Sequence, residues 1–129
     1  HTTDSEFDVS KLETLPRVDI IYSHVDDDRI MADAAVAAGA KGIIHAGTGN
    51  GSIANPTMEG LKDAVAKGVV VVRSARVPNG ATTVSLPMWT KAGFLESDTL
   101  NPQKARLLLQ LALTKTQDPK EIQRMFDQY

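Results

Sequence analysis

The chain of 129 residues contains no cysteine, which excludes a disulfide framework and a metal site built from thiolate ligands. It has no block of clustered Lys and Arg, because 14 basic side chains are dispersed among 16 acidic ones for a net charge of −2. Proteins that bind nucleic acid concentrate basic side chains on one face, so nucleic acid is not an expected partner. No apolar run approaches the roughly 20 residues of a membrane-spanning helix, so no membrane partner is expected either.

The amino-acid composition is typical of a globular protein, with 42% hydrophobic and 23% charged side chains. The length suits one domain with a single core. The first residue is His1 rather than Met, and no signal-peptide pattern follows it. The chain is therefore a processed protein or a piece of a longer one, and we favour the piece.

Strand and helix patterns alternate along the chain. Apolar runs rich in β-branched residues predict strands over 18–25, 41–46 and 69–72. Apolar residues at helical spacing predict helices over 30–38 and from Asn55 onward, with Asn55 as N-cap and Pro56 at the first helical position. This order predicts the α/β class: a three-layer, Rossmann-like small domain with a parallel sheet of about three to four strands flanked by helices.

The C-terminal part of the chain predicts two more helices. Asn101 and Asp118 are N-cap residues followed by proline, and Glu121 completes a capping box with Asp118. Residues 80–95 lack a firm period and predict a loop with one short extended piece. Residues 1–16 lack sustained periodicity as well and predict an arm or linker.

Three glycines, Gly47, Gly49 and Gly51, follow the second predicted strand and present Asn50 and Ser52 at the surface. Ligands of open parallel sheets bind beyond the carboxyl ends of the strands, where this loop belongs. The spacing matches neither the dinucleotide fingerprint nor a P-loop, so a phosphate site is the weakest interpretation. A tight turn without a ligand and a small-molecule or interface loop both stay open.

The remaining polar residues do not complete a catalytic constellation. His24 and His45 lie near the ends of neighbouring predicted strands, but no acidic residue completes a metal site, and we expect hydrogen-bonded structural histidines. Arg73 and Arg76 are interpreted as strand-end arginines in ordinary ion pairs. Glu96 is interpreted as a solvated surface acid.

Several stretches, read together, resemble the C-terminal domain of bacterial L-asparaginases, especially the secreted type II enzymes and the glutaminase-asparaginases. The resemblance covers nearly the whole chain, and the order and spacing of the stretches make it specific. They are His1-Thr2-Thr3, Phe7-Asp8-Val9, Leu15-Pro16, Ala46 to Ser52, Val72-Arg73-Ser74, Val77-Pro78, Leu100 to Arg106 and Ala112 to Thr116.

The resemblance implies an amidohydrolase that releases ammonia from asparagine, and often from glutamine, with no cofactor and no metal. In that family a threonine nucleophile, a second Thr, a Lys and an Asp act from a larger N-terminal domain, so no residue of this chain receives a catalytic role.

Residues 1–16 would be the interdomain linker and residues 17–129 the C-terminal α/β domain. The implied partners are the protein's own N-terminal domain and further copies, as a homotetramer built from two intimate dimers. The implied location is periplasmic or secreted. The alternative is a non-enzymatic small α/β domain for assembly or amino-acid binding.

The resemblance assigns substrate contacts to two residues of the glycine loop. Asn50 matches an asparagine of the family's loop, and Ser52 matches a position that surrounds the α-amino end of a substrate bound by a neighbouring subunit. One expected feature does not match. Many members carry a glutamate after the Val77-Pro78 turn, whereas the corresponding residues 83–89 contain no acid and Pro87 lies nearest to that position.

Overall fold

A computed structural model describes residues 4–49, 51–77, 82 and 87–129. Its centre is a four-stranded sheet in which every neighbouring pair of strands is parallel and the strand order follows the chain. The strands are β1 (Val18–Tyr22), β2 (Gly42–Gly47), β3 (Val70–Ala75) and β4 (Leu95–Glu96). The predicted α/β fold with a small parallel sheet is confirmed.

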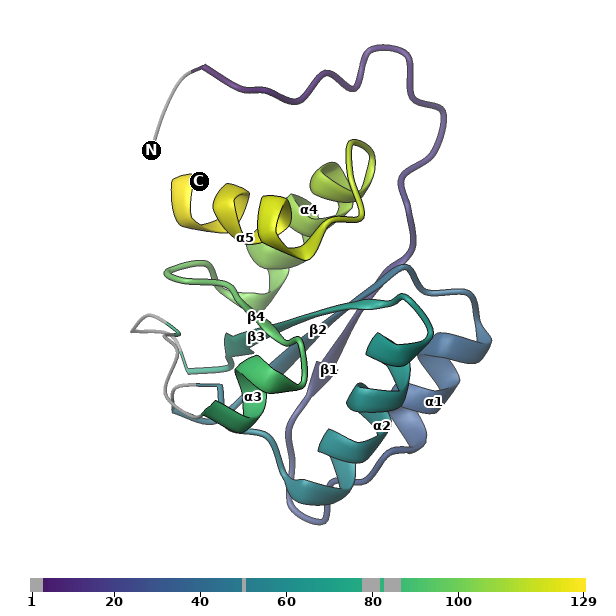
Figure 1. The fold of residues 1–129 in the computed structure, drawn as a ribbon, viewed down its shortest axis with the longest axis vertical. Helices are drawn as coiled ribbons and strands as arrows, with labels where there is room; N and C mark the ends of the chain where they lie inside the picture. Colours follow the sequence, from purple (N-terminus) through teal and green to yellow (C-terminus); the bar gives the residue numbers. More distant parts are fainter. Residues whose placement is uncertain (1–3, 50, 78–81, 83–86) are drawn as a thin grey trace.

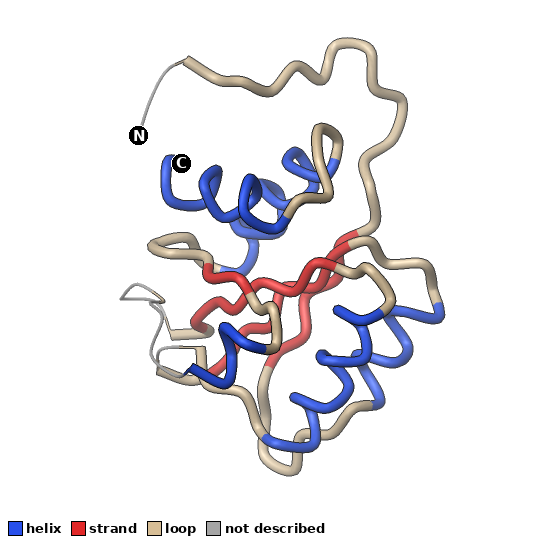
Figure 2. The backbone as a smooth tube through the Cα atoms, in the orientation of Figure 1, coloured by secondary structure: helices blue, strands red, loops and turns tan. Residues whose placement is uncertain are grey.

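Helices cover both faces of the sheet and give the domain three layers (Figure 1). One face is covered by α1 (Ile30–Ala37), α2 (Asn55–Ala66) and α3 (Pro87–Lys91), and the other by α4 (Pro102–Leu113) and α5 (Pro119–Gln128). Figure 2 shows the strands as a central layer between the two groups of helices. Because the chain leaves the first face only after β4, the two helical layers come from consecutive parts of the sequence.

The central position of β2 and β3 in the sheet explains why their sequences are almost continuously apolar. All six residues of β2 and all six of β3 are buried, as parallel strands with helices on both faces require. Side chains alternate between the two cores along these strands. Ile43 and Val71 are paired and point to α1 and α2, whereas the next pair, Ile44 and Val72, points to α4 and α5.

Side chains of the C-terminal helices cap both edges of the sheet. Arg106 of α4 donates from Nε to the carbonyl of Val18, 2.7 Å away on the edge strand β1. On the opposite edge, the amide of Gln123 pairs with the backbone N–H and the carbonyl of Glu96, at 3.0 and 3.1 Å. Edge strands with unpaired backbone groups invite pairing with other chains, and these contacts satisfy part of that potential.

The N-terminal arm, residues 4–17, forms neither helix nor strand and runs past α4 and α5 (Figure 1). Its Glu6 lies beside the C-terminal residue, because the N–H of Glu6 donates to the Tyr129 hydroxyl at 3.1 Å. The Glu6 carboxylate accepts from Arg124 of α5 at 2.9 and 3.0 Å and from Lys115 at 3.2 Å. The Phe7 ring packs on Tyr129 with 5.5 Å between centroids. The arm is therefore attached to the domain near Glu6 and again where β1 begins.

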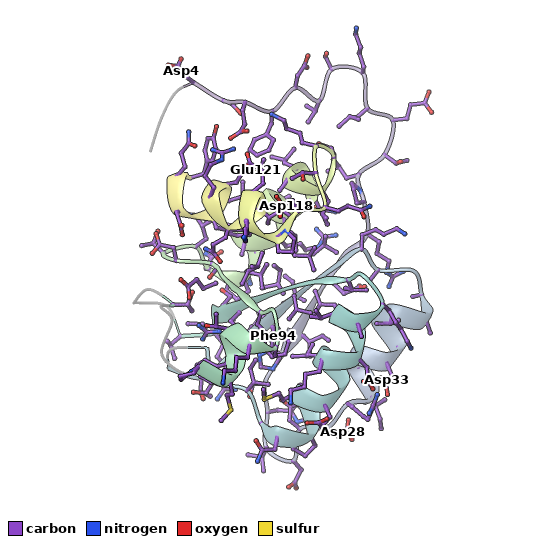
Figure 3. The ribbon with its side chains drawn as sticks, viewed as in Figure 1. Asp4, Asp28, Asp33, Phe94, Asp118 and Glu121 are labelled. Atoms are coloured by element: carbon purple, nitrogen blue, oxygen red, sulfur yellow. The ribbon has the colours of Figure 1, made fainter. Side chains whose placement is uncertain are left out.

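The structure corrects some predicted helix starts. The N-cap of α2 is Ala54, which has extended backbone and makes no side-chain cap, so Asn55 is already helical and Pro56 is the second helical residue. Proline is tolerated there because the first helical N–H groups have no partner within the helix. Asn101 and Asp118 are N-caps as predicted. The predicted capping box between Asp118 and Glu121 (Figure 3) is wrong, because the N–H of Asp118 donates to Thr116 Oγ1 at 3.0 Å and the Glu121 carboxylate accepts from Arg124.

The described part of residues 80–95 contains more structure than predicted. A short strand, β4, begins only at Leu95, the last residue of this segment, and the helix α3 was not anticipated. Its Trp89 is buried in the same core cluster as Phe94, and this burial stabilises a helix whose sequence lacks a helical period. At the other end of the sheet, β1 stops at Tyr22, three residues before the predicted strand does.

Candidate functional site

Backbone contacts bring the loops after β1, β2 and β3 together at the carboxyl edge of the sheet. The N–H of Ser23 donates to the carbonyl of Ala46 at 2.9 Å, and the N–H of Arg76 donates to the carbonyl of Gly47 at 2.8 Å. The guanidinium of Arg76 also donates to the carbonyl of Ser23 at 2.9 Å. The edge where a parallel α/β sheet binds its ligands is thus built from three linked segments.

The glycine loop, residues 47–52, is closed by its own backbone. The carbonyl of Thr48 accepts from the N–H groups of Gly51 and Ser52, both at 3.0 Å. Gly49 and Gly51 have φ values of +53° and +76°, which favour glycine as the sequence predicts. Gly47 is needed for a different reason, because a Cβ there would lie within 2.2 Å of the Ser52 carbonyl oxygen.

Of the two residues predicted to contact substrate, Ser52 lies within the described part of the chain. Ser52 is exposed at the end of the glycine loop, while its neighbours Gly51 and Ile53 are buried. Asn50 lies outside the described residues. Of the segment in which a family glutamate was expected, residues 83–86 lie outside as well, and Pro87 is an exposed residue at the start of α3.

The two histidines have different environments. His24 is exposed and its ring nitrogens lie 2.8 Å from the Val25 carbonyl oxygen and 3.1 Å from Asp27 Oδ1. His45 is fully buried in β2, and neither ring nitrogen has a hydrogen-bond partner within the described part of the chain. The prediction of a hydrogen-bonded histidine is wrong for His45. Burial lowers its pKa from 6.5 to about 4, with Arg73 acting in the same direction and Asp27 opposing it.

Arg73 forms an ion pair as predicted, but it does not lie at the end of its strand, since it sits inside the sheet with only 2% of its surface exposed. Its guanidinium carbon lies 4.2 Å from the centre of the Trp89 ring, and its Nη2 lies 3.5 Å from the Glu96 carboxylate on β4. Glu96 is consequently a half-buried ion-pair partner and not a solvated acid. Burial raises its pKa, and the nearby Arg73 opposes that change.

Neither a metal site nor a membrane span is found in the described ranges. No three or more His, Asp and Glu side chains there are grouped so that they could hold a metal ion. No helix within the same ranges has the length and the apolar character to cross a bilayer.

Comparison with known proteins identifies the family to which this α/β domain belongs. The family model described as "Glutaminase/Asparaginase C-terminal domain" matches residues 17–126, which is most of the chain. The chain belongs to this family. The resemblance that the sequence motifs indicated is therefore confirmed.

Relatives of this asparaginase domain match it along its whole length. L-asparaginase 2 of Bacillus subtilis and L-asparaginase 2 of Escherichia coli are 53% and 52% identical over 100% of the chain, which corresponds to 34% and 37% of the relatives. A crystal structure described as a probable cytoplasmic L-asparaginase from Campylobacter jejuni matches with a TM-score of 0.91 at 50% identity, over 96% of this chain and 40% of that one.

Two further relatives differ in name. A protein of Haemophilus influenzae named as a probable periplasmic L-asparaginase is 48% identical, and a glutaminase-asparaginase of Pseudomonas fluorescens is 44% identical, each over 100% of this chain. The asparaginase domain spans little more than a third of the length of the curated relatives it matches.

Sequence reasoning missed one group of polar residues at this edge. Ser74, Thr82 and Ser97 are buried hydroxyls, and Gly51 of the glycine loop packs against the first two residues. Serine and threonine at irregular spacing carry no signal in the sequence, because only the fold brings these three segments together.

Proposed function

We propose that this chain is the C-terminal part of an amidohydrolase that converts asparagine to aspartate and ammonia, with glutamine as a second substrate. The exposed Ser52, whose N–H is hydrogen-bonded to the Thr48 carbonyl, carries this proposal, since its hydroxyl is a small donor and acceptor at the ligand-binding edge of the sheet. Small polar groups at fixed positions orient a ligand without rearrangement. The asparaginase and glutaminase-asparaginase names of relatives matched over the whole chain support this substrate class.

The glycine loop contributes Ser52 and Asn50 to an active site whose nucleophile belongs to another part of the protein. Residues 1–16 link that part to the domain formed by residues 17–129. In the assembled enzyme the loop serves a neighbouring subunit, and two intimate dimers form a tetramer. The chain by itself hydrolyses neither amino acid, since it provides substrate contacts and no threonine nucleophile.

We further propose a periplasmic or secreted location for the complete protein. The name of the Haemophilus influenzae relative supports it. The Campylobacter jejuni relative, described as cytoplasmic, is as similar, so fractionation of the source cells has to decide between the two.

The test compares the 129-residue chain with the complete polypeptide that contains it. Ammonia release from asparagine is expected only from the complete polypeptide. Replacing Ser52 with Ala there should raise the KM for asparagine by roughly tenfold, because one polar substrate contact is lost. Ser10→Ala, an exposed serine in the arm, is the matched control and should leave KM unchanged. Ammonia release by the purified 129-residue chain would contradict the proposal, as would an S52A enzyme with normal KM.

The size of Ser52 provides a separate test of substrate choice. Serine is shorter than asparagine, so the site leaves room for the longer side chain of glutamine. Ser52→Asn is expected to lower the ratio of glutamine to asparagine kcat/KM. An unchanged ratio would show that Ser52 does not set this preference.

A further inference from the structure

Three buried hydroxyl groups lie next to the glycine loop and take no part in the proposed function. They belong to Ser74 near the end of β3, to Thr82 and to Ser97 just after β4, and at most 2% of each residue is exposed. A buried hydroxyl is unfavourable unless it is hydrogen-bonded. Three of them at one place in a small domain therefore require an explanation. We call these residues the hydroxyl cluster.

The hydrogen bonds of the hydroxyl cluster converge on one backbone carbonyl. The hydroxyls of Ser74 and Ser97 donate to the carbonyl oxygen of Leu100 at 3.1 and 3.0 Å. The hydroxyl of Thr82 lies 3.2 Å from that of Ser97, 3.4 Å from the carbonyl oxygen of Asp98 and 3.5 Å from that of Arg73, so its single proton has three acceptors within reach. The N–H of Thr82 also donates to the carbonyl of Asp98 at 2.8 Å. Three segments that are distant in sequence are joined in this way.

The hydroxyl cluster supports the glycine loop through Gly51. A Cβ on Gly51 would lie 3.2 Å from the Ser74 carbonyl oxygen and 3.3 Å from Cγ2 of Thr82. The backbone of Gly51 thus packs directly on the cluster. The following residue is Ser52, whose N–H shares the Thr48 carbonyl with that of Gly51. A displacement of Thr82 or Ser74 would move Gly51, and Ser52 with it.

We propose that Thr82 and Ser97 are positioning residues, which hold Ser52 at the place where it contacts substrate. This inference rests on the proposed function of Ser52 and adds the residues that determine its location. Hydrogen bonds suit this task better than apolar packing, because they fix both distance and direction. A displacement of about 1 Å at a contact residue is enough to weaken binding.

The first experiment measures amide hydrogen exchange in the 129-residue chain. Thr82→Val keeps the shape of the side chain but removes the hydroxyl, and Ser97→Ala removes the hydroxyl that contacts both Thr82 and the Leu100 carbonyl. Both are expected to speed exchange at Gly51 and Ser52 by about tenfold, the effect of losing one hydrogen bond.

The matched control is Thr57→Val. Thr57 is also a fully buried threonine, and its hydroxyl donates to the Asp28 carbonyl at 3.1 Å. This variant loses an equivalent hydrogen bond elsewhere in the domain, so exchange at Gly51 and Ser52 should not change. If T82V and S97A leave those two amides unchanged, or T57V alters them equally, the inference is overturned.

The second experiment measures asparagine hydrolysis by the complete polypeptide. T82V and S97A are expected to raise KM by roughly tenfold with little change in kcat, because they disturb a contact to bound substrate and not the nucleophile. T57V should have a normal KM. A fall in kcat with unchanged KM in T82V and S97A would overturn the positioning role.

The two experiments separate the inference from the function on which it rests. If S52A has no effect on KM, the proposed role of Ser52 fails, and the exchange measurements still decide whether the hydroxyl cluster orders the loop. If S52A raises KM but T82V and S97A do not, the proposed function stands and the positioning role is overturned.

Discussion

His45 shows how much one side chain in a buried strand can depend on its surroundings. It occupies a position of β2 where the residues before and after it are Ile44 and Ala46, both fully buried. Within the described residues its ring nitrogens have no hydrogen-bond partner, and burial lowers its pKa to about 4. The imidazole is therefore neutral in the folded protein near pH 7, although histidines in unfolded chains bind a proton near pH 6.5.

This lowered pKa predicts a loss of stability in mild acid. As the pH falls below 6.5 the unfolded chain binds a proton at His45 and the folded chain does not, so the free energy of unfolding decreases until the pH nears 4. Between pH 7 and pH 5 the decrease is about 2 kcal/mol. Urea unfolding of His45→Leu at both pH values should show a decrease smaller by that amount.

The control for the acid effect is Thr57→Val, which changes a buried side chain that has no ionisable group. It should show the same loss of stability between pH 7 and pH 5 as the unsubstituted protein. An H45L variant that is as acid-sensitive as the unsubstituted protein would show that His45 is not the group responsible.

At the scale of elements, α1 and α2 lie close together because of a glycine. A Cβ on Gly60 of α2 would be 2.7 Å from Cβ of Arg29 and 3.3 Å from Cβ of Ala32 in α1. The close approach lets Arg29 pair with Asp33 of its own helix and with Asp63 of α2. Alanine residues along α1 serve the same end, since Ala32 and Ala35 are its buried positions.

Gly60→Ala is expected to destabilise the domain although alanine favours helices. The added methyl would force the two helices apart, at a cost of about 1–3 kcal/mol, while the gain in helix propensity is about 1 kcal/mol. A net loss in the free energy of urea unfolding, with an unchanged m value, is the expected observation. Lys62→Ala, at an exposed position of α2, is the control and should not destabilise. A more stable G60A protein would refute the close-packing argument.

At the scale of the whole molecule, the N-terminal arm is attached through Glu6 to the C-terminal part of the domain. Glu6 accepts from Arg124 and Lys115, its N–H donates to the Tyr129 hydroxyl at 3.1 Å, and the Lys115 ammonium lies 5.9 Å from the centre of the Phe7 ring. The hydrogen bond from Arg124 lowers the pKa of Glu6. Between this attachment and β1, residues 8–15 are all exposed.

Removing the charge of Glu6 should free the arm without unfolding the domain. In Glu6→Gln the ion pairs with Arg124 and Lys115 are lost, and trypsin should cleave after the exposed Lys11 faster, by roughly two- to fivefold at low salt. Since salt screens exposed charges, the difference from the unsubstituted chain should shrink at high salt. Glu59→Gln removes an exposed ion pair on α2 and is the control. Equal cleavage rates for E6Q and the unsubstituted chain would contradict this account of the arm.

The sequence by itself determined the alternation of strands and helices, since burial on both faces demands continuous apolar strands and one-sided burial demands helical periodicity. It also indicated the glycine loop, because Gly49 and Gly51 need positive φ, and it indicated the family through the order of its motifs. Only the tertiary structure decided which polar residues are buried. Arg73, His45 and the hydroxyl cluster have ordinary local sequences. The partners of Arg73 and of the hydroxyl cluster, such as Trp89, Glu96 and Leu100, come from segments that only the folded chain brings together. The same holds for α3, which is held by the burial of Trp89 and not by a helical pattern.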